Sequence, residues 1–217
     1  MRENAYLNNQ NFHNFLLTPD TMRFTDSGFP IVKALTELPA KEIEGFLPFN
    51  FLLSKDCSKK AIHFYIQDYM FDRVWNNPNK YISALQKCPL VTGPDFSLFR
   101  DTPYPIQIFN VYRTRWLEAY WQSKDITVVP NVRWSDHKSY EWCFNGLPTN
   151  SIISISATGC LKEKEAAKLF FAGYEKAQSR LKPRMIILHC AKGYVDKLKA
   201  VTKVPCRFVT YSYLNGE

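Results

Sequence analysis

Two carboxylates and one histidine occupy places in the sequence where acid–base chemistry could occur. Asp68 and Asp95 each come shortly after an apolar run, and His189 lies late in another. Carboxylates on adjacent strand ends can divide acid–base work between them once burial separates their pKa values. We therefore predict Asp68, Asp95 and His189 as catalytic candidates. The structural alternative is that Asp68 caps a helix or turn and that His189 is a hydrogen-bonded core residue.

Further residues that follow the apolar runs could bind a ligand. Gly159 comes directly after one run and shortly before a helical segment, where backbone N–H groups can hold a phosphate. Trp134 comes directly after another run and suits stacking on a sugar or a base. The residues predicted to bind the ligand on this basis are Ser97, Arg113, Asn131, Trp134, Asp136, Thr158 and Gly159. For Ser97 and Asp136 the structural alternative is again a helix cap or a turn.

Arg113 is a charged residue at a position where the helical pattern predicts an apolar one. It falls within the apolar arc of a helix expected over residues 103–124, beside Ile106, Phe109 and Tyr120. A buried guanidinium must be paired, because an unpaired one costs several kcal/mol. Its partner is either a core carboxylate or a ligand anion. The polar residues expected on the opposite, outer side of this helix are Gln107, Thr114, Glu118 and Gln122.

The positions of these residues depend on an alternation of strands and helices from residue 61 onward. Short apolar runs predict strands over residues 61–66, 90–97, 126–132, 151–159, 184–190 and 206–211. Helical patterns lie between them over residues 71–88, 103–124, 135–144, 162–183 and 194–202. Such an alternation predicts an α/β fold of repeated βα units with a mainly parallel sheet.

The expected architecture is an incomplete or irregular TIM-like (βα) barrel, because successive units look alike. The alternative is a doubly wound open sheet. In both, the carboxyl ends of the strands gather at one rim and bind ligands there. Residues 1–60 are predicted to form an irregular N-terminal arm or cap, and residues 61–217 the α/β domain. Together they would make one structural domain.

The charge of the chain favours an anionic partner. Its 217 residues carry a formal net charge of +8, and 15% of them are aromatic. A nucleotide, a nucleic acid or a phosphorylated small molecule would suit such a protein. The alternative is a solvated surface that happens to be basic. The sequence indicates no particular cofactor.

The six cysteines show no zinc-binding spacing, so no metal site is predicted. Several lie in apolar runs, where free cysteine behaves as a small hydrophobic residue. The first residues carry no signal-peptide pattern, and no apolar stretch reaches the ~18 residues of a membrane span. We therefore expect a cytoplasmic protein with reduced thiols and no membrane partner.

Three segments resemble a known family in the order in which they occur. They are HFYIQDYMFDRVWNNPNKY, TGPDFSLFRDTPYPIQIFNVYRTRW and AYWQSKDITVVPNVRWSD, and they include a P-D-F-S segment at Pro94–Ser97 and a Y-W-Q segment at Tyr120–Gln122. From about residue 60 to residue 190 the chain resembles the bacterial and phage family called domain of unknown function 4417. The resemblance implies no activity. It implies a bacterial or mobile-element origin, and it adds Trp121 and Gln122 to the predicted ligand-binding residues as motif positions.

Two classes of function fit these observations. The first is an enzyme that acts on a phosphate- or sugar-containing, nucleotide-like ligand in a polar pocket at the strand ends. Asp95 and Asp68 would then be acid–base residues, Arg113 an anion anchor and Trp134 a stacking wall. The alternative is a non-catalytic protein of a phage or mobile element that binds nucleic acid or another protein. Whether the chain is an enzyme is open at this point.

Overall fold

The strands are parallel throughout and form two sheets. A computed structural model describes residues 14–211 of the chain. The first sheet contains β1 (Gly45–Pro48), β2 (Lys60–His63), β3 (Leu90–Thr92) and β4 (Val128–Val129). The second contains β5 (Ile152–Ser156), β6 (Met185–Ala191) and β7 (Cys206–Tyr211). The predicted α/β fold with parallel strands is confirmed.

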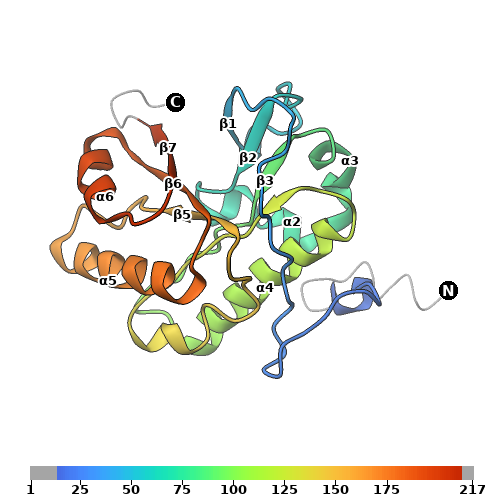
Figure 1. Cartoon of the computed structure of the whole chain (residues 1–217). Coiled ribbons are helices and arrows are strands. Elements are labelled where there is room, and N and C mark those ends of the chain that lie inside the picture. Colours follow the sequence, from blue (N-terminus) through green and yellow to red (C-terminus); the bar gives the residue numbers. More distant parts are fainter. Residues whose placement is uncertain (1–13, 212–217) are drawn as a thin grey trace.

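The helices lie around the outside of the strands (Figure 1). The α-helices are α2 (Arg73–Asn76), α3 (Ile82–Leu85), α4 (Tyr104–Gln122), α5 (Lys164–Leu181) and α6 (Val195–Val201). The 3-10 helices are η1 (Asn14–Leu17), η2 (Phe49–Phe51), η3 (Asp68–Met70), η4 (Pro78–Tyr81), η5 (Lys138–Glu141) and η6 (Lys192–Tyr194). Among the described helices, none is both long enough and apolar enough to cross a membrane.

Strand order follows chain order in both sheets. Short backbone links beyond β4 connect the two sheets, because Val132 N–H donates to Ser154 O over 2.9 Å and Ser154 N–H donates to Pro130 O over 2.8 Å. Within the described residues no ladder joins β1 to β7, so the sheet is not closed. The structure therefore does not show a TIM barrel. The order also lacks the reversal that defines a doubly wound sheet.

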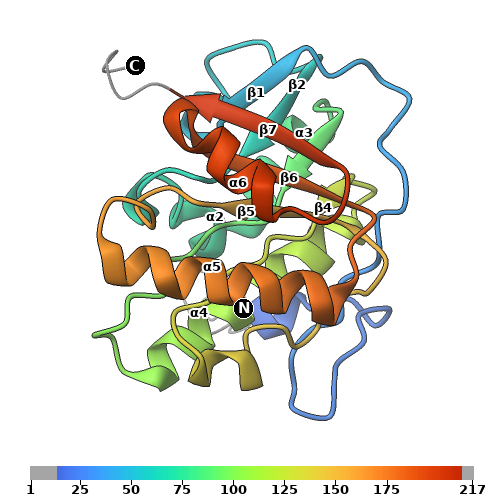
Figure 2. The same cartoon turned by 60° about the vertical axis from the view of Figure 1, so that its left-hand side comes forward.

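One apolar cluster receives side chains from all seven strands. Buried Ala61, Leu90, Val129, Ile152 and Ile187 form its centre, and half-buried residues of β1 and β7 pack against it. Because every strand contributes to the same cluster, the strands must curve around a common interior. The turned view shows α5 and α6 on the outer side of the second sheet (Figure 2). Two larger clusters fill the space between the strands and the helices.

The sheet begins earlier than the predicted α/β domain. β1 lies within residues 1–60, for which the sequence predicts an irregular arm, and Gly45 pairs with Lys60 of β2. The segment before it also contributes to the fold, because half-buried Leu35 and Leu38 pack against the interior cluster. The parts of the predicted arm and domain at residues 1–13 and 212–217 lie outside the described residues.

The predicted polar outer side of α4 is wrong. Gln107 and Glu118 are fully buried, whereas Ile106, expected in the apolar arc, is 51% exposed. Other parts of the chain pack against this helix on several sides. Trp116 Nε1 donates to Thr18 Oγ1 over 3.0 Å, and Arg115 Nη2 donates to Cys143 O in the connection between β4 and β5. A helix packed on more than one side need not show a single apolar stripe.

Two other predicted helices are shorter than expected. Within residues 135–144 only η5 forms, and the Asp136 carboxylate accepts a bond from Ser139 N–H in its first turn over 3.1 Å. Residues 71–88 break into α2, η4 and α3. The break lies at Asn77 and Pro78, since the residue before a proline is pushed out of the helical region.

We predict that Gly93→Ala destabilises the protein by roughly 1–3 kcal/mol. A Cβ at this position would overlap the Glu118 carboxylate, which is held in place by its own hydrogen bonds. Chemical denaturation would measure the change. Gly193→Ala is the matched control, because a Cβ there meets nothing within 4 Å, and its unfolding free energy should shift by less than about 0.5 kcal/mol. Equal stabilities for the two variants would contradict this packing.

Candidate functional site

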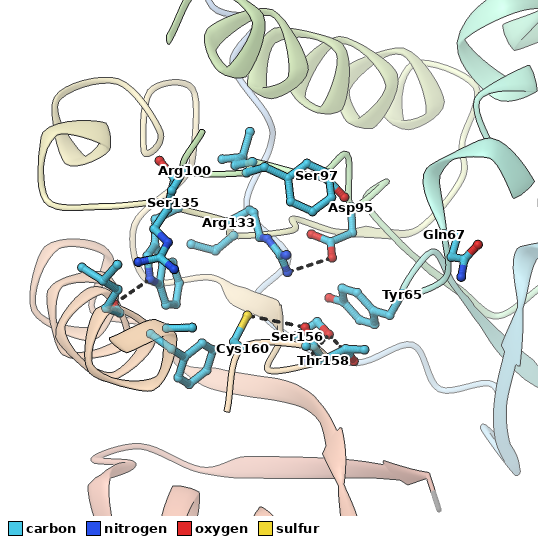
Figure 3. A pocket seen from close by; sticks show the side chains of 18 of the residues that line it. Tyr65, Gln67, Asp95, Ser97, Arg100, Arg133, Ser135, Ser156, Thr158 and Cys160 are labelled. Atoms are coloured by element: carbon cyan, nitrogen blue, oxygen red, sulfur yellow. Dashed lines mark hydrogen bonds and ion pairs between the residues drawn. The ribbon is translucent and has the colours of Figure 1, made fainter. Parts of the chain in front are cut away.

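A cavity of about 480 Å³ lies at the carboxyl ends of β2, β3, β4 and β5. Its walls come from the segments that follow these strands and from the first half of α5 (Figure 3). Its volume is within the range of small-molecule sites. Five of the residues that the sequence predicts for the site line it: Asp95, Ser97, Trp134, Thr158 and Gly159.

An ion pair lies at the floor of the cavity. Arg133 Nη1 donates to Asp95 Oδ2 over 3.1 Å, and the two side chains are 22% and 9% exposed (Figure 3). Burial raises the pKa of Asp95, whereas Arg133 and the hydrogen bond from Asn131 act to lower it. Burial acts to lower the pKa of Arg133, but Asp95 together with Cys160, Asp68 and Tyr65 outweighs burial and raises the pKa. Arg133 is thus a permanent cation beside a carboxyl that holds its proton more tightly than usual.

Asn131 orients Asp95. Its Nδ2 donates to Asp95 Oδ1 over 3.0 Å and to Pro94 O over 3.1 Å. Its Oδ1 accepts a bond from Tyr65 Oη over 3.1 Å. Asn131 is itself fully buried and does not line the cavity, so it acts on the site through Asp95 and Tyr65.

The backbone of Asn131 is clamped by a buried ion pair from α4. Glu118 Oε1 accepts a bond from Asn131 N–H over 2.6 Å, and Arg115 Nη1 donates to Asn131 O over 2.9 Å. The two side chains also pair with each other over 3.0 Å. Burial raises the pKa of Glu118 to about 7, against the opposing effect of Arg115.

Asp68 fixes the loop after β3 and does not line the cavity. Its two carboxylate oxygens accept bonds from Ser97 N–H over 3.0 Å and from Ser97 Oγ over 2.8 Å. The two predicted catalytic carboxylates therefore differ in their position relative to the cavity. Asp95 borders the cavity, and Asp68 holds the segment that forms its edge.

His189 lies behind the cavity wall. Its Nδ1 is 3.2 Å from Thr158 Oγ1, which in turn accepts a bond from Ser156 Oγ over 2.8 Å. Its ring centroid is 4.8 Å from that of His63 on β2, across the interior of the sheet. Burial lowers the pKa of His63 to about 3 and that of His189 to about 4, so both imidazoles are neutral near pH 7.

Aromatic and aliphatic groups form the outer wall. Trp134 Nε1 donates to Leu169 O of α5 over 3.2 Å, and its ring lies 5.5 Å from that of Phe170. A Cβ on Gly173 would overlap this indole, so a glycine is required where α5 passes Trp134. The cavity thus combines an arginine–aspartate pair with an apolar wall.

Four of the predicted ligand-binding residues lie away from the cavity. Arg113 pairs with Asp72 over 3.3 Å and stacks on Phe96, which is the structural role that the sequence left open. Trp121 is fully buried in the core. Gln122 binds the backbone N–H and carbonyl of Lys33, and Asp136 accepts a bond from Ser139 N–H in η5.

Several cavity residues were not among those predicted. Those with polar side chains are Tyr65, Gln67, Arg100, Arg133, Ser135, Ser156 and Cys160, and Phe99 is among the apolar ones. The rule that ligands bind at strand ends does cover Gln67, Arg133, Ser135 and Ser156, but the predicted site residues do not include them. Arg100 lies in the loop before α4, where the sequence gives no signal.

No group of three or more His, Cys, Asp or Glu side chains in residues 14–211 is arranged to hold a metal ion. All six cysteines are free thiols. Cys160 is the one whose side chain belongs to the cavity lining, and its thiol donates to Thr158 O over 3.5 Å.

Fold and site together define a parallel α/β protein with a cavity at its strand ends. The chain belongs to the family described as domain of unknown function (DUF4417), whose match covers residues 25–204. This confirms the resemblance and extends it beyond residues 60–190.

Two curated relatives come from mycobacteriophages. The "Gene 1 protein" of Mycobacterium phage D29 is 36% identical over 138 residues, which cover 64% of this chain and 51% of that protein. The "Gene 1 protein" of Mycobacterium phage L5 is 32% identical over 170 residues, covering 75% of this chain and 74% of that protein. The chain thus spans about half the length of the D29 relative. No solved structure matches the chain.

We predict that the two buried histidines lower the stability of the protein as the pH falls from 6.5 toward 4, while Glu118, whose pKa is raised to about 7, acts in the opposite direction. The buried histidines have pKa values of about 3 and 4 when folded and take up protons near 6.5 when unfolded, so acid favours the unfolded state. Between pH 7 and 5, the free energy of unfolding of His189→Gln should fall by roughly 2 kcal/mol less than that of wild type. Denaturant unfolding at several pH values would measure it. The exposed His137 provides the control variant His137→Gln, and identical pH profiles for both variants would contradict the account.

Proposed function

We propose that the chain is an enzyme that acts on a phosphate- or sugar-containing, nucleotide-like ligand in the cavity. The observation that carries the proposal is the Arg133 guanidinium, which Asp95 holds at the cavity floor while 22% of the side chain stays exposed. Arginine suits phosphate because its planar donors match two oxygens at once. A second arginine, Arg100, borders the same cavity.

The remaining lining supports a ligand that has both hydroxyls and a ring. Ser135 Oγ is buried and has no hydrogen-bond partner in the described part of the chain, so a ligand group could supply one. Ser97, Ser156 and Thr158 add further hydroxyls. The indole of Trp134 offers an apolar surface for a base or a sugar ring.

Asp95 is the proposed acid–base residue. Its raised pKa moves the carboxyl toward neutral pH, where an acid–base residue transfers protons most effectively. His189 is placed to act only through Thr158, because this hydroxyl lies between the imidazole and the cavity. Arg113, Trp121, Gln122 and Asp136 have no place in the proposal.

The proposal includes an architecture and a location. Sequential parallel strands around one interior cluster support an incomplete (βα) barrel as the scaffold, with the site at its usual end. Free thiols and phage relatives support a cytoplasmic location in a bacterial cell or a phage-infected host.

We predict that Arg133→Gln weakens the binding of adenosine 5′-monophosphate by roughly 10- to 100-fold, because a charge-assisted hydrogen bond contributes about 1.5–3 kcal/mol. Calorimetric titration would measure the affinity. Arg133→Lys, which keeps the charge, should lie between wild type and Arg133→Gln. Arg184→Gln removes the same charge at the opposite end of β6 and should bind like wild type. Equal losses in Arg184→Gln and Arg133→Gln would rule out a specific role for Arg133.

We predict that Asp95→Asn separates binding from catalysis. The variant keeps the shape of the side chain and the bond to Asn131 but cannot exchange a proton. The amide nitrogen then stands where Oδ2 accepted the bond from Arg133, so Arg133 is held less firmly, whereas a negative charge beside the anion is gone. These two effects oppose each other, so the affinity for phosphate compounds should change by less than about tenfold. A panel of nucleotides and sugar phosphates, followed by ³¹P NMR, should show conversion by wild type only. No conversion by wild type, despite binding, would favour a non-catalytic binding protein.

A further inference from the structure

A second hollow adjoins the cavity and enlarges the site. It is an open, shallow depression bordered by Phe99, Arg100 and Asp101, three consecutive residues in the loop between β3 and α4. Phe99 and Arg100 also line the main cavity. The two spaces therefore meet at these residues, and a ligand that fills the cavity can continue outward across the loop.

Phe99 is one of several exposed large hydrophobic residues in the described part of the chain. Its side chain is 63% exposed, although it borders two concave surfaces. A large exposed aromatic ring beside a binding cavity is typical of a stacking platform. Stacking on such a ring tolerates any base, because every base has a π-face.

Arg100 is available to a ligand at little cost. Its Nη2 is 3.7 Å from Glu163 Oε2, and the two side chains are 50% and 59% exposed. An exposed pair at this distance contributes little to stability. Glu163 keeps its own role without Arg100, since its carboxylate caps α5 by accepting bonds from Glu165 N–H and Ala166 N–H, both over 2.7 Å.

The loop that carries Phe99 and Arg100 is fixed at both ends. Asp68 binds Ser97 on one side, and Asn110 Nδ2 donates to Ser97 O over 2.8 Å. On the other side Gln107 Nε2 donates to Thr102 O over 2.6 Å. A loop held in this way presents its ring and its cation in place, which lowers the entropy that a ligand must overcome.

We propose that the cavity and the second hollow receive two consecutive nucleotides of a single-stranded nucleic acid. The inference rests on the proposed function, and it names the substrate class of that site. One phosphate lies at Arg133 and the next at Arg100, and the outer base stacks on Phe99. Asp101 accepts hydrogen bonds from a sugar hydroxyl or a base amino group. The net charge of +8 favours such a polyanion.

A single strand fits these features better than a duplex or an acidic peptide. A base inside a duplex would have to leave its stack to enter the cavity. An acidic peptide offers carboxylates to the two arginines but has no regular ring for Phe99. Two arginines and an exposed ring border the joined space, and phosphates and bases alternate along a single strand.

The test compares adenosine 5′-monophosphate with a 5′-phosphorylated oligoadenylate of three nucleotides, by calorimetric titration on the full chain. Wild type should bind the oligonucleotide roughly tenfold more tightly than the mononucleotide. Phe99→Ala should remove most of that gain and weaken the binding of the oligonucleotide more than that of the mononucleotide, because Phe99 borders both spaces. The matched control is Phe24→Ala, because Phe24 is 43% exposed and lines neither hollow, and it should retain the gain.

Each remaining outcome counts against the inference in a distinguishable way. If the mononucleotide binds through Arg133 but the oligonucleotide binds no more tightly, the two-nucleotide site is wrong and the proposed function stands. If neither binds, both are wrong. If an acidic peptide binds more tightly than the oligonucleotide, the partner is a protein. If Phe99→Ala still binds the oligonucleotide about tenfold more tightly than the mononucleotide, Phe99 does not stack on a base.

Discussion

The site depends on a buried ion pair that is not part of it. Glu118 accepts a hydrogen bond from the Asn131 backbone N–H, and Arg115 donates one to the Asn131 carbonyl. Asn131 can then orient Asp95 with its side chain, and Asp95 positions Arg133. A buried pair of charges is weak evidence for stability, because desolvation offsets most of its attraction. The pair instead fixes the position of Asn131, because it connects α4 to the end of β4, where the cavity begins. The close approach of Glu118 also explains why Gly93 has no side chain.

Along the strands, the residues in the interior change from apolar ones near the amino-terminal end to polar ones near the cavity. At the amino-terminal side the strands share an apolar cluster that includes Ala61 and Ile187. Farther along β2 and β6, His63 and His189 face each other as neutral imidazoles. Beyond them lie the charged and hydroxyl groups of the cavity. Polar groups with shifted pKa values gathered at one end of a sheet are a recognised mark of functional sites.

The sequence predicts the general arrangement well and the individual contacts poorly. Apolar runs locate β2 to β7, and the rule about strand ends brings Asp95, Ser97, Trp134, Thr158 and Gly159 to one cavity. Local pattern cannot reveal tertiary partners, however. Helix periodicity misplaces Glu118 because α4 is covered on more than one side, and it draws attention to Arg113 instead of Arg115. Motif membership alone does not separate site from scaffold, since Trp121 lies in the core and Gln122 holds the N-terminal segment.

The central claim is that Asp95 holds Arg133 ready for a phosphate in the cavity. The most direct measurement is a crystal structure of the protein grown with adenosine 5′-monophosphate. The account predicts phosphate oxygens within hydrogen-bonding distance of Arg133 and a ring packed on Trp134, with Asn131 still bonded to Asp95. A nucleotide bound elsewhere, or a cavity filled by the protein's own side chains with Arg133 turned away, would contradict it.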